Sequence, residues 1–587
     1  MQETFDDLYK RSKEGENFNN LYELITSREN ILLAYRTIKS NKGSKTKGTD
    51  EITIDNIKVV NESEFVNIIR KVLENYKPKS VRRVLIPKAN GKKRPLGIPS
   101  MRDRLIQQMF KQILEPIAEA KFFNHSYGFR PLRKTQDAIS RCSSLINKSK
   151  LHYVVDVDIE GFFDNVNHNL LKKQIWNIGI RDKRVISIIS KMLKAPIKGE
   201  GIPNKGTPQG GILSPLLSNI VLNDLDQWVA KQWELFETRH TYSRVDGKYK
   251  QLVKTNLKKG FIVRYADDFK ILTDNHKNAY KWFHAVRLYL KERLKLDISK
   301  EKSKVINLRK NSSEFLGFKL KVTLKDDRYV THTKIKEKKK TAIIEQAKEH
   351  IDKIYRKPSV ENMVHYNQFV LGTHNYFKFA THVSTEFREI DFKLHRMMYN
   401  RLGRIGFKKE VPNNASKTYK RFYKNKYMTW SFKDYHLYPL QDIKFNIPYG
   451  FSQFKTLYTK EGRELIHKEL IKDITVNIQR LMKSKLPNKS VEYMDNRISR
   501  YSMVQGKCEI MGNFLSSDEV HCHHFIPSLA GGKDEYDNLR IVHKLVHKLI
   551  HATRDETISK YLNLLQLNSR QLKKLNSYRK ACNLENI

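Results

Sequence analysis

The residues best suited to chemistry are two adjacent aspartates, Asp267 and Asp268, between two short runs of β-branched and aromatic residues. The runs, 261–265 and 269–272, predict a β-hairpin with the aspartates at or near its turn. Neighbouring carboxylates repel each other unless a cation shares them, and Mg²⁺ is a hard divalent cation suited to oxygen ligands. The pair favours a metal site, although a turn that simply carries two aspartates would look the same.

A further carboxylate set ends a predicted strand well upstream of this hairpin. Residues 155–159 alternate between apolar and acidic side chains, so Asp156 and Asp158 face the same side of the strand. A strand carboxylate that meets the hairpin pair could hold two Mg²⁺ ions, which clamp the attacking and leaving oxygens of a phosphoryl transfer. We therefore expect Asp158 to converge with Asp267 and Asp268 across a β-sheet, as the metal-binding and catalytic carboxylates.

These motifs carry a family resemblance. The tetrapeptide Tyr265-Ala266-Asp267-Asp268 resembles the catalytic box of reverse transcriptases. From about Val81 to the last histidines, the motifs follow the order found in proteins encoded by group II introns, which combine reverse transcriptase, maturase and HNH endonuclease. The resemblance implies an α+β multidomain fold: a right-hand polymerase of fingers, palm and thumb, a helical maturase region, and a C-terminal ββα-metal HNH domain.

The resemblance also implies a set of dNTP-binding residues. A basic hairpin over 81–99 would be the fingers hairpin, although its cations could instead follow the template backbone. An aromatic ring after the catalytic strand would stack under the sugar and exclude a 2′-hydroxyl, unless it is only a core residue. The Gly/Pro run 206–217 opens an apolar helix and would reach toward base and sugar. The residues concerned are Lys88, Arg94, Phe163, Gln209 and Gly210.

Two further segments are expected to hold primer and template. Gly128 allows close backbone approach, and Arg130, two residues later, is expected to contact the template. Phe315, Leu316 and Gly317 resemble the box that grips the primer strand. Residues 226–260 are polar and basic and look like an inserted, partly helical segment that contacts nucleic acid; their role stays open.

The composition indicates a polyanionic partner. The chain has 111 Lys and Arg against 63 Asp and Glu, a formal net charge of +48, with 28 Tyr and 28 Phe interleaved. This mixture suits phosphate contacts and base stacking. An anionic membrane is the alternative partner, but no run of 18 apolar residues predicts a membrane span.

Cysteine usage and the N-terminus bear on location. Four scattered cysteines, Cys142, Cys508, Cys522 and Cys582, are too few for a disulfide framework and fit a reducing compartment. The acidic start resembles neither a signal peptide nor an Arg-rich transit peptide. We expect a bacterial cytoplasm, with an organelle matrix as the alternative.

At 587 residues the chain exceeds the size of a single core, so several domains are expected. Composition shifts and the resemblance together predict an N-terminal RNA-binding extension (1–75), reverse transcriptase fingers and palm (76–325), a thumb/maturase domain (326–440), a DNA-binding region (441–500) and an HNH endonuclease (501–587).

The C-terminal histidines form a second candidate centre. A short strand carrying His521, His523 and His524 precedes a Gly turn and a helix, and His543, His547 and His551 repeat every four residues. Such histidines can bind one divalent ion. In the HNH resemblance His523 and His547 are metal ligands with His551 as a third candidate, His524 is the general base, and Asn538 fixes the loop and orients that base.

One departure from the family pattern concerns structural zinc. The motif is often bracketed by two Cys-x-x-Cys pairs, but here Cys508 is followed by Met511, and His543 and Val546 stand in the second pair. Methionine and valine cannot replace thiolates. We expect no four-cysteine zinc site, although Cys508 and His543 could bind a metal weakly, and cleavage could persist if apolar packing holds the domain.

The resemblance implies an RNA-directed DNA polymerase that assists intron splicing, nicks target DNA and extends the cut end for intron mobility. Its partners would be group II intron RNA, target DNA, an RNA template with a DNA primer, and dNTPs, in a ribonucleoprotein whose oligomeric state stays open. The alternatives are a splicing factor with a vestigial polymerase, a standalone nuclease and a defence-type reverse transcriptase. The intron class, host and DNA target are not readable from the sequence.

Overall fold

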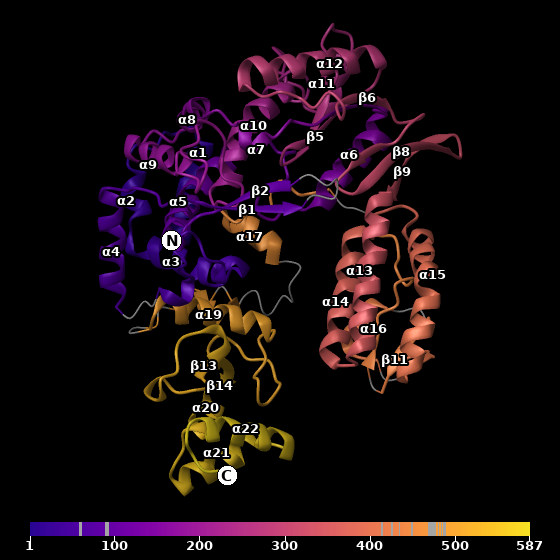
Figure 1. Ribbon diagram of the computed structural model, residues 1–587. Coiled ribbons are helices and arrows are strands. Elements are labelled where there is room, and N and C mark those ends of the chain that lie inside the picture. Colours follow the sequence, from indigo (N-terminus) through magenta and orange to yellow (C-terminus); the bar gives the residue numbers. More distant parts are fainter. Residues whose placement is uncertain are drawn as a thin grey trace.

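The computed structural model describes residues 1–587 except 58–60, 88–92, 413–414, 424–426, 434, 448–449, 468–476, 479, 483, 485 and 487–488, and except the side chains at positions 42, 245, 417, 418, 467 and 491. Figure 1 shows its layout. An N-terminal block adjoins a central sheet, a helical arm extends from the far side of that sheet, and a C-terminal unit lies beneath the N-terminal block.

The N-terminal block is a set of amphipathic helices with one β-hairpin. Its longest helix starts where Ser100 accepts a hydrogen bond from the Asp103 amide, which satisfies one of the free donors of the first turn. The antiparallel hairpin runs in register from Arg82 opposite Ile98 to Pro87 opposite Lys93. The elements are α1 (Gln2–Lys13), α2 (Leu21–Ile25), α3 (Arg28–Lys39), η1 (Lys42–Lys45), η2 (Ile54–Asn56), α4 (Glu62–Glu74), β1 (Arg82–Pro87), β2 (Lys93–Ile98) and α5 (Met101–Lys121).

The central sheet has four antiparallel strands in the order β4-β5-β3-β6. Helices α10 and α12 contact it from one face and α6 from the other. The strands are β3 (Tyr153–Val157), β4 (Phe261–Tyr265), β5 (Asp268–Thr273) and β6 (Lys304–Asn307). The helices are α6 (Thr135–Ser149), α7 (Phe162–Asn165), α8 (His168–Asn177), α9 (Lys183–Leu193), α10 (Ser214–Lys231), α11 (Val245–Leu252), α12 (His276–Tyr289) and the π-helix η3 (Leu290–Leu294).

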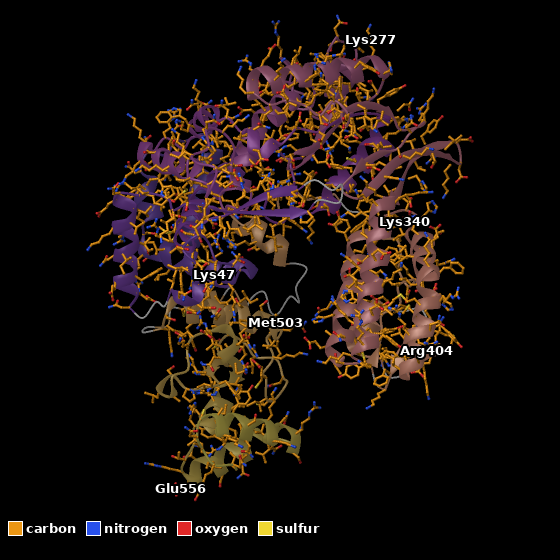
Figure 2. The ribbon with its side chains drawn as sticks, in the orientation of Figure 1. Lys47, Lys277, Lys340, Arg404, Met503 and Glu556 are labelled. Atoms are coloured by element: carbon orange, nitrogen blue, oxygen red, sulfur yellow. The ribbon has the colours of Figure 1, made fainter. Side chains whose placement is uncertain are left out.

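The helical arm begins with a three-stranded sheet, β7 (Ser313–Phe315), β8 (Phe318–Lys325) and β9 (Arg328–Ile335). Three long helices lie side by side after it, with Lys340 at the end near the sheet and Arg404 at the far end (Figures 1 and 2). They are α13 (Glu337–Arg356), α14 (Val360–Phe377) and α15 (Val383–Leu402). Smaller elements close the far end: η4 (Gly403–Ile405), β10 (Lys408–Glu410), α16 (Lys417–Phe422), β11 (Thr429–Phe432) and β12 (Tyr435–His436).

Residues 441–467, here called the connector, return from the arm to the N-terminal block and end in α17 (Lys460–His467). Tyr458 donates to Glu115 at 3.3 Å, and Arg463 donates to both carboxylate oxygens of Asp6 at 2.7 Å. This part of the expected DNA-binding region is therefore docked against the body of the protein. Of its linker signal at 486–490, positions 487 and 488 lie outside the described residues.

The C-terminal unit contains α19 (Val491–Met503), the hairpin of β13 (Val520–His524) and β14 (Leu539–His543), α20 (Lys544–Ile550), α21 (Asp555–Leu565) and α22 (Ser569–Ala581), with short turns η5 (Ser528–Ala530) and η6 (Tyr536–Asn538). It has its own hydrophobic core. Ion pairs join it to α3, including Arg36 with Asp495 at 2.5 Å and Lys39 with Glu535 at 3.3 Å.

Two larger cores hold the rest together. One joins the N-terminal block to the α10 and α12 face of the central sheet, and the other joins the α6 face to the arm. The central sheet is thus buried on both sides. Among the described helices, none combines the length and the apolar character that crossing a bilayer requires.

Candidate functional site

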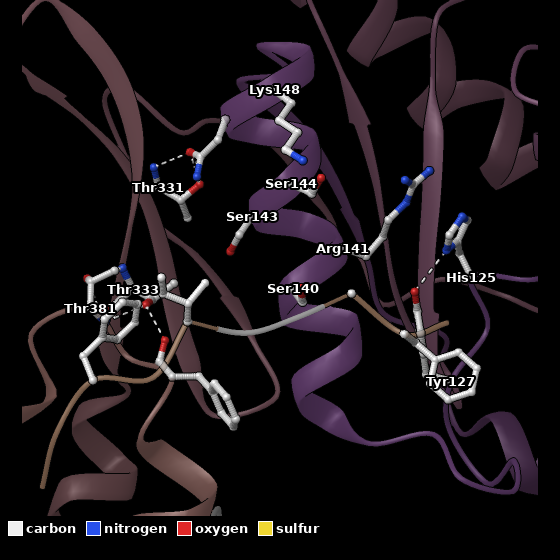
Figure 3. Close-up of a pocket in the computed structure, with 16 residues that line it drawn as sticks. His125, Tyr127, Ser140, Arg141, Ser143, Ser144, Lys148, Thr331, Thr333 and Thr381 are labelled. Atoms are coloured by element: carbon white, nitrogen blue, oxygen red, sulfur yellow. Dashed lines mark hydrogen bonds between the residues drawn. The ribbon is translucent and has the colours of Figure 1, made fainter. Parts of the chain in front are cut away.

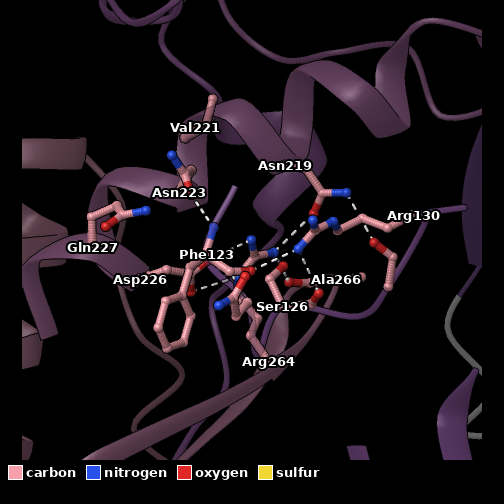
Figure 4. Close-up of polar contacts among 12 residues, drawn as sticks. Phe123, Ser126, Arg130, Asn219, Val221, Asn223, Asp226, Gln227, Arg264 and Ala266 are labelled. Atoms are coloured by element: carbon pink, nitrogen blue, oxygen red, sulfur yellow. Dashed lines mark hydrogen bonds and ion pairs between the residues drawn. The ribbon is translucent and has the colours of Figure 1, made fainter. Parts of the chain in front are cut away.

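The turn that carries Asp267 and Asp268 is held from behind by a buried arginine (Figure 4). Ala266 opens the turn at φ +58°, in the left-handed region. Arg264, 1% exposed, donates to both carboxylate oxygens of Asp226 at 2.6–2.9 Å. It also donates to the carbonyl oxygen of Ala266 at 2.7 Å. A bidentate, fully buried pair of this kind fixes the turn because neither charge has another partner of equal strength.

The backbone at Gly128 closes over the same turn. A Cβ on Gly128 would lie 2.2 Å from the Ala266 amide nitrogen, so only glycine fits there. Tyr127 donates its amide to the Arg264 carbonyl at 2.9 Å. Asn219 donates to the Gly128 carbonyl at 2.9 Å and accepts from Arg264 at 3.0 Å. The close approach expected from the sequence is therefore against the aspartate turn.

The structure brings the three expected carboxylates to one edge of the central sheet. Val157 pairs with Phe269, so Asp158 and Asp268 leave β3 and β5 side by side. Burial raises the pKa of Asp268 to about 6, although Lys270 opposes the shift, and nearby carboxylates add to it. Burial also raises the pKa of Asp267, with a further contribution from Asp158. Mutually repelling, desolvated carboxylates are the environment that a divalent cation relieves.

Asp156 and Asp158 pair with different lysines, and this difference sets which of them is accessible. Lys270 lies directly across the ladder from Asp156 and donates to it at 2.6 Å, with the ammonium fully buried. Asp156 is thereby neutralised inside the sheet. Asp158 pairs with Lys302 at 3.0 Å, but both side chains are largely exposed, so that pair is easily exchanged for a cation. Asp158 is thus the strand carboxylate available to a metal.

An open cavity of about 820 Å³ lies in front of these carboxylates. Its floor includes Asp158 and Asp268, and its walls include Leu316, Gly317 and a group of lysines at the start of α13. An acidic floor between basic walls suits a phosphate backbone whose reacting end meets metal ions.

Two residues expected to contact primer or template are instead internal. Phe315 is 1% exposed and packs under the Lys270 ammonium, 5.0 Å from its ring centroid. Leu316 and Gly317, at φ +50° and +84°, form the turn that lines the cavity. Phe315 therefore supports the turn from below, because its place in the β7 alternation points its ring into the core.

Arg130, which was expected to contact the template, is the second internal residue. Its guanidinium donates to both carboxylate oxygens of Glu119 at 2.9–3.2 Å and to the carbonyls of Phe123 and Ser126. Its side chain is 2% exposed. All of these bonds are local, so the residue stabilises the loop before Gly128 and is not available to a template.

The first hairpin contacts the Gly/Pro loop that carries Gln209. Arg94, which is exposed, donates to Gln209 at 2.7 Å, and Gly97 donates its amide to the Gln209 carbonyl at 2.6 Å. Gly210 has φ +113°, and a Cβ there would lie 2.5 Å from the Gly97 carbonyl oxygen. Two segments far apart in sequence thus place the Arg94 guanidinium next to the Gln209 side-chain amide. Lys88 lies outside the described residues.

Phe163, in α7, is 8% exposed and lies between two other rings. It contacts Phe129 and Phe162 edge-on at centroid distances of 6.3 and 5.3 Å, and its carbonyl accepts from Thr207 at 2.7 Å. The ring is thus fixed beside the loop that carries Gln209.

Away from the carboxylates, a cavity of about 540 Å³ with a mainly apolar lining lies where α6, β9 and the connector meet (Figure 3). Arg141 and Lys148 enter it from α6, and Thr331 and Thr333 from β9. Phe451 of the connector lines it too. The connector therefore packs at the joint between the central sheet and the arm.

A larger groove of about 1270 Å³ follows α8 and α9. Trp176, 37% exposed, lies on its wall. The groove is rich in cations: Lys77, Lys172, Lys173, Lys183, Lys191 and Lys194.

The C-terminal hairpin divides its histidines between two faces. His521 and His523 share one face of β13, where His523 contacts the rings of His547, His551 and Tyr578. Burial and neighbouring histidines lower the pKa of His523 and of His547 to about 3 each. These imidazoles are neutral at physiological pH, as metal ligands must be.

His524 faces the other side. Its ring stacks on Tyr493 at 5.3 Å, and Nε2 lies 2.6 Å from Asp534. Asn538 accepts from the Ile526 amide at 2.8 Å and donates to the Ile526 and Lys533 carbonyls. Asn538 thus holds the loop as expected, while Asp534 and Tyr493 orient the His524 ring.

Two further sequence-based assignments change. His543 belongs to β14 and caps α20, where its Nδ1 accepts from the Leu545 amide at 3.1 Å. Within the described part of the chain, one group of three His, Cys, Asp or Glu ligand atoms lies within a mutual 4.8 Å, and it consists of His523, His551 and Cys582. Asp158, Asp267 and Asp268 do not form such a group, so their ligand atoms are not all within 4.8 Å of one another, and His547 is not in the converged set.

The sequence reasoning missed Arg264, Asp226, Asp534 and Cys582. Arg264 carried a weak signal, a cation inside an apolar strand next to the aspartates. The others are placed by contacts between distant segments and have no local signature.

Comparison with known proteins identifies the sequence family. Residues 86–320 match the family model described as reverse transcriptase (RNA-dependent DNA polymerase). The group II intron-encoded protein LtrA of Lactococcus lactis subsp. cremoris is 33% identical over 359 residues, covering 53% of this chain and 59% of LtrA. This chain therefore spans somewhat over half the length of that relative.

Two other relatives agree. Protein YkfC of Escherichia coli (strain K12) is 33% identical over 322 residues, which cover 51% of this chain and 82% of YkfC. The putative COX1/OXI3 intron 2 protein of Saccharomyces cerevisiae is 30% identical over 367 residues, 54% of this chain and 42% of that protein. The expectation drawn from the Tyr-Ala-Asp-Asp box and the motif order is confirmed: the chain belongs to the group II intron reverse transcriptase/maturase family.

Proposed function

We propose that this protein is an RNA-directed DNA polymerase that also assists splicing of a group II intron RNA and nicks target DNA for target-primed reverse transcription and intron mobility. The N-terminal block with β1 and β2 would be the fingers, the central sheet the palm and the helical arm the thumb and maturase region. The main support is the meeting of Asp158 with Asp268 at the edge of the sheet, next to the Asp267 turn.

Two Mg²⁺ ions fit the three carboxylates, since desolvation and mutual repulsion raise the pKa values of Asp267 and Asp268. When bound there, they would neutralise charge on the attacking and leaving oxygens. Arg264 and Gly128 keep the turn rigid, so the carboxylates need little reorganisation. Lysines from α13 hold the primer-template backbone along the cavity wall.

The incoming nucleotide would bind between the first hairpin and the Gln209 loop. Arg94 exchanges its bond with Gln209 for the triphosphate, and the Gly210 backbone allows close approach to the sugar. Phe163, fixed by its neighbouring rings, blocks a 2′-hydroxyl. Lys88 would be a further contact to the triphosphate, as the family resemblance implies.

RNA binding draws on the basic surface beyond the active site. The six-lysine groove along α8 and α9 combines cations with an exposed Trp176 ring, which suits phosphate contact and base stacking. Replacing Lys172 and Lys173 by Gln should weaken intron RNA binding and reduce its salt dependence, because each lysine releases counterions on binding. Its proposed location is a bacterial cytoplasm, in line with the bacterial relatives, with an organelle matrix as the alternative.

The C-terminal unit would be the HNH endonuclease, with His524 as general base, oriented by Asp534, and residues 441–500 would contribute to DNA binding. An imidazole that hydrogen-bonds a carboxylate through one ring nitrogen can accept a proton from water at the other. His523, with other ligands of the cluster, would hold one divalent ion.

Primer extension on an RNA template with dNTPs and Mg²⁺ tests the polymerase. Asp267→Ala should abolish cDNA synthesis and leave intron RNA binding intact; persistent extension would remove the metal assignment. If the wild-type protein binds RNA and aids splicing but never extends a primer, it is a splicing factor with a vestigial polymerase.

Strand cleavage tests the second activity. His524→Ala should stop bottom-strand cleavage of target DNA while primer extension continues. Loss of both activities in one variant would argue against two independent sites.

A further inference from the structure

The C-terminal helix brings a thiol into the histidine cluster. Cys582, at the end of α22, has its ligand atom within 4.8 Å of those of His523 and His551. The cysteine lies far from both histidines in sequence, and no Cys-x-x-Cys or His-x-Cys spacing marks it as a ligand.

The histidine at the back of this cluster lacks a partner. His523 is 2% exposed, and its Nε2 is buried without a hydrogen-bond partner among the described residues. An orphaned polar nitrogen inside a core is costly. His551 is exposed at the front and Cys582 is partly buried, so a cation held by all three would be reached from one side.

The position of Cys582 is fixed by a buried arginine one turn earlier. Arg579, 3% exposed, donates to the carbonyls of Leu549, Ile550 and Ala552 at 2.8–3.2 Å. These carbonyls lie around the end of α20, on both sides of His551. Arg579 therefore clamps α22 to the end of the helix that carries the histidine.

His547, a ligand in the sequence-based prediction, lies beside this cluster with its ring centroid 4.8 Å from that of His551, but it is not in the converged set. Its ring stacks on His521 with centroids 3.7 Å apart. The stacked His521–His547 pair flanks the converged set of His523, His551 and Cys582.

We propose that His523, His551 and Cys582 form a three-ligand site for a borderline or soft divalent cation, typically Zn²⁺, with an open fourth position. Two imidazoles and a thiolate suit Zn²⁺ and are poor ligands for Mg²⁺. Tetrahedral zinc holds its ligand atoms roughly 3.5 Å apart, so small side-chain rotations would close the present arrangement. Three protein ligands and an open position are the pattern of catalytic zinc. The proposal names the metal of the proposed nuclease, but cation binding can be tested without cleavage.

Cobalt spectroscopy of the full-length protein tests the ligand set. After chelator treatment, Co²⁺ is added and sulfur-to-cobalt charge transfer is recorded in the near ultraviolet; Co²⁺ at the palm-type carboxylates gives no such band. We expect the band in wild type, its displacement by Zn²⁺ and its persistence in excess Mg²⁺. Cys582→Ser should remove the band and weaken Zn²⁺ binding on the order of tenfold or more.

Matched variants decide the remaining outcomes. Cys582→His, which keeps a ligand, should bind Zn²⁺ without the sulfur band, and circular dichroism checks that each variant is folded. His547→Ala and Cys508→Ser should retain the band. A wild-type protein without the band, a band that survives Cys582→Ser, or a band lost in Cys508→Ser would overturn the assignment. Absence of DNA cleavage with an intact band would instead count only against the nuclease.

Discussion

The central sheet and the C-terminal unit both place candidate metal ligands on an antiparallel ladder, but with opposite chemistry. At the sheet edge Asp158 and Asp268 line an open, lysine-walled cavity of about 820 Å³, and Asp267 precedes Asp268 in the same turn. In the C-terminal unit neutral imidazoles surround the buried His523. The first suits a hard cation that works on phosphates in water, and the second a softer cation held by the protein. Ligand type and burial together select the metal.

Each centre also depends on a buried arginine, and the two arginines differ in their partners. Arg264 binds the carboxylate of Asp226 together with the Ala266 carbonyl, whereas Arg579 binds backbone carbonyls only. Burial lowers the pKa of Arg579. The Arg264 pair stiffens a turn that must hold repelling charges, and Arg579 only joins two helices.

The largest expected effect is a loss of primer extension that leaves the C-terminal histidine cluster unchanged. Asp267→Asn should lower primer extension roughly 10⁴-fold, because a two-metal site supplies several kcal/mol of charge stabilisation. The C-terminal cobalt signal should not change. Asp327→Asn, in the exposed β8–β9 turn, is the matched control and should extend primers normally. Equal losses in both variants would mean that general acidity of the surface, and not the site, is responsible.

The second prediction compares the arginines. Arg264→Met should cost about 3–5 kcal/mol of stability, since Asp226 is left buried and unpaired. Arg579→Met leaves neutral carbonyls and should cost about 1–3 kcal/mol. Denaturant midpoints measure both, with Arg244→Ala of the exposed Arg244–Asp246 pair as a near-neutral control. A larger loss for Arg579 than for Arg264 would reverse the comparison.

A third prediction concerns the base in the C-terminal unit. Asp534→Asn should reduce target-strand cleavage about 10- to 100-fold, because the carboxylate that orients His524 is lost. Primer extension should be unchanged. Asp537→Asn, three residues away in the same loop, is the control. If Asp534→Asn cleaves at the wild-type rate, Asp534 does not orient a catalytic base.

The smallest effect is a pH-dependent stability gain. The folded-state pKa of Asp268, about 6, is above its ordinary 3.8, so the folded protein binds this proton more tightly than the unfolded chain. Stability from this group is therefore present at low pH and is lost as pH rises from about 4 through 6. Without metal, Asp268→Asn should raise stability by up to about 2 kcal/mol at pH 8 and by little at pH 4.

Added Mg²⁺ provides the control for that measurement. It should stabilise the wild-type protein at pH 8 and leave Asp268→Asn nearly unaffected, because binding to the folded state requires the ionised carboxylate. A variant that is less stable than wild type at pH 8 without metal would show that Asp268 is not a strained charge.

The sequence already contained most of the proposed polymerase site. Period-two alternation put Asp156 and Asp158 on one face of a strand, and β-branched runs predicted the hairpin around Asp267 and Asp268; both elements are present in the structure. Local pattern could not tell which strand aspartate is free. That depended on Lys270, which lies across the ladder and neutralises Asp156.

Residue type and local spacing thus determined the hairpins, the carboxylates and the histidine-rich strand, because these depend on neighbours along the chain. Tertiary structure alone decided that Arg130 and Phe315 are internal, that Asp534 orients His524 and that Cys582 joins His523. Burial and long-range contacts set those roles, and a side chain's partner across the fold leaves no mark in its own sequence neighbourhood.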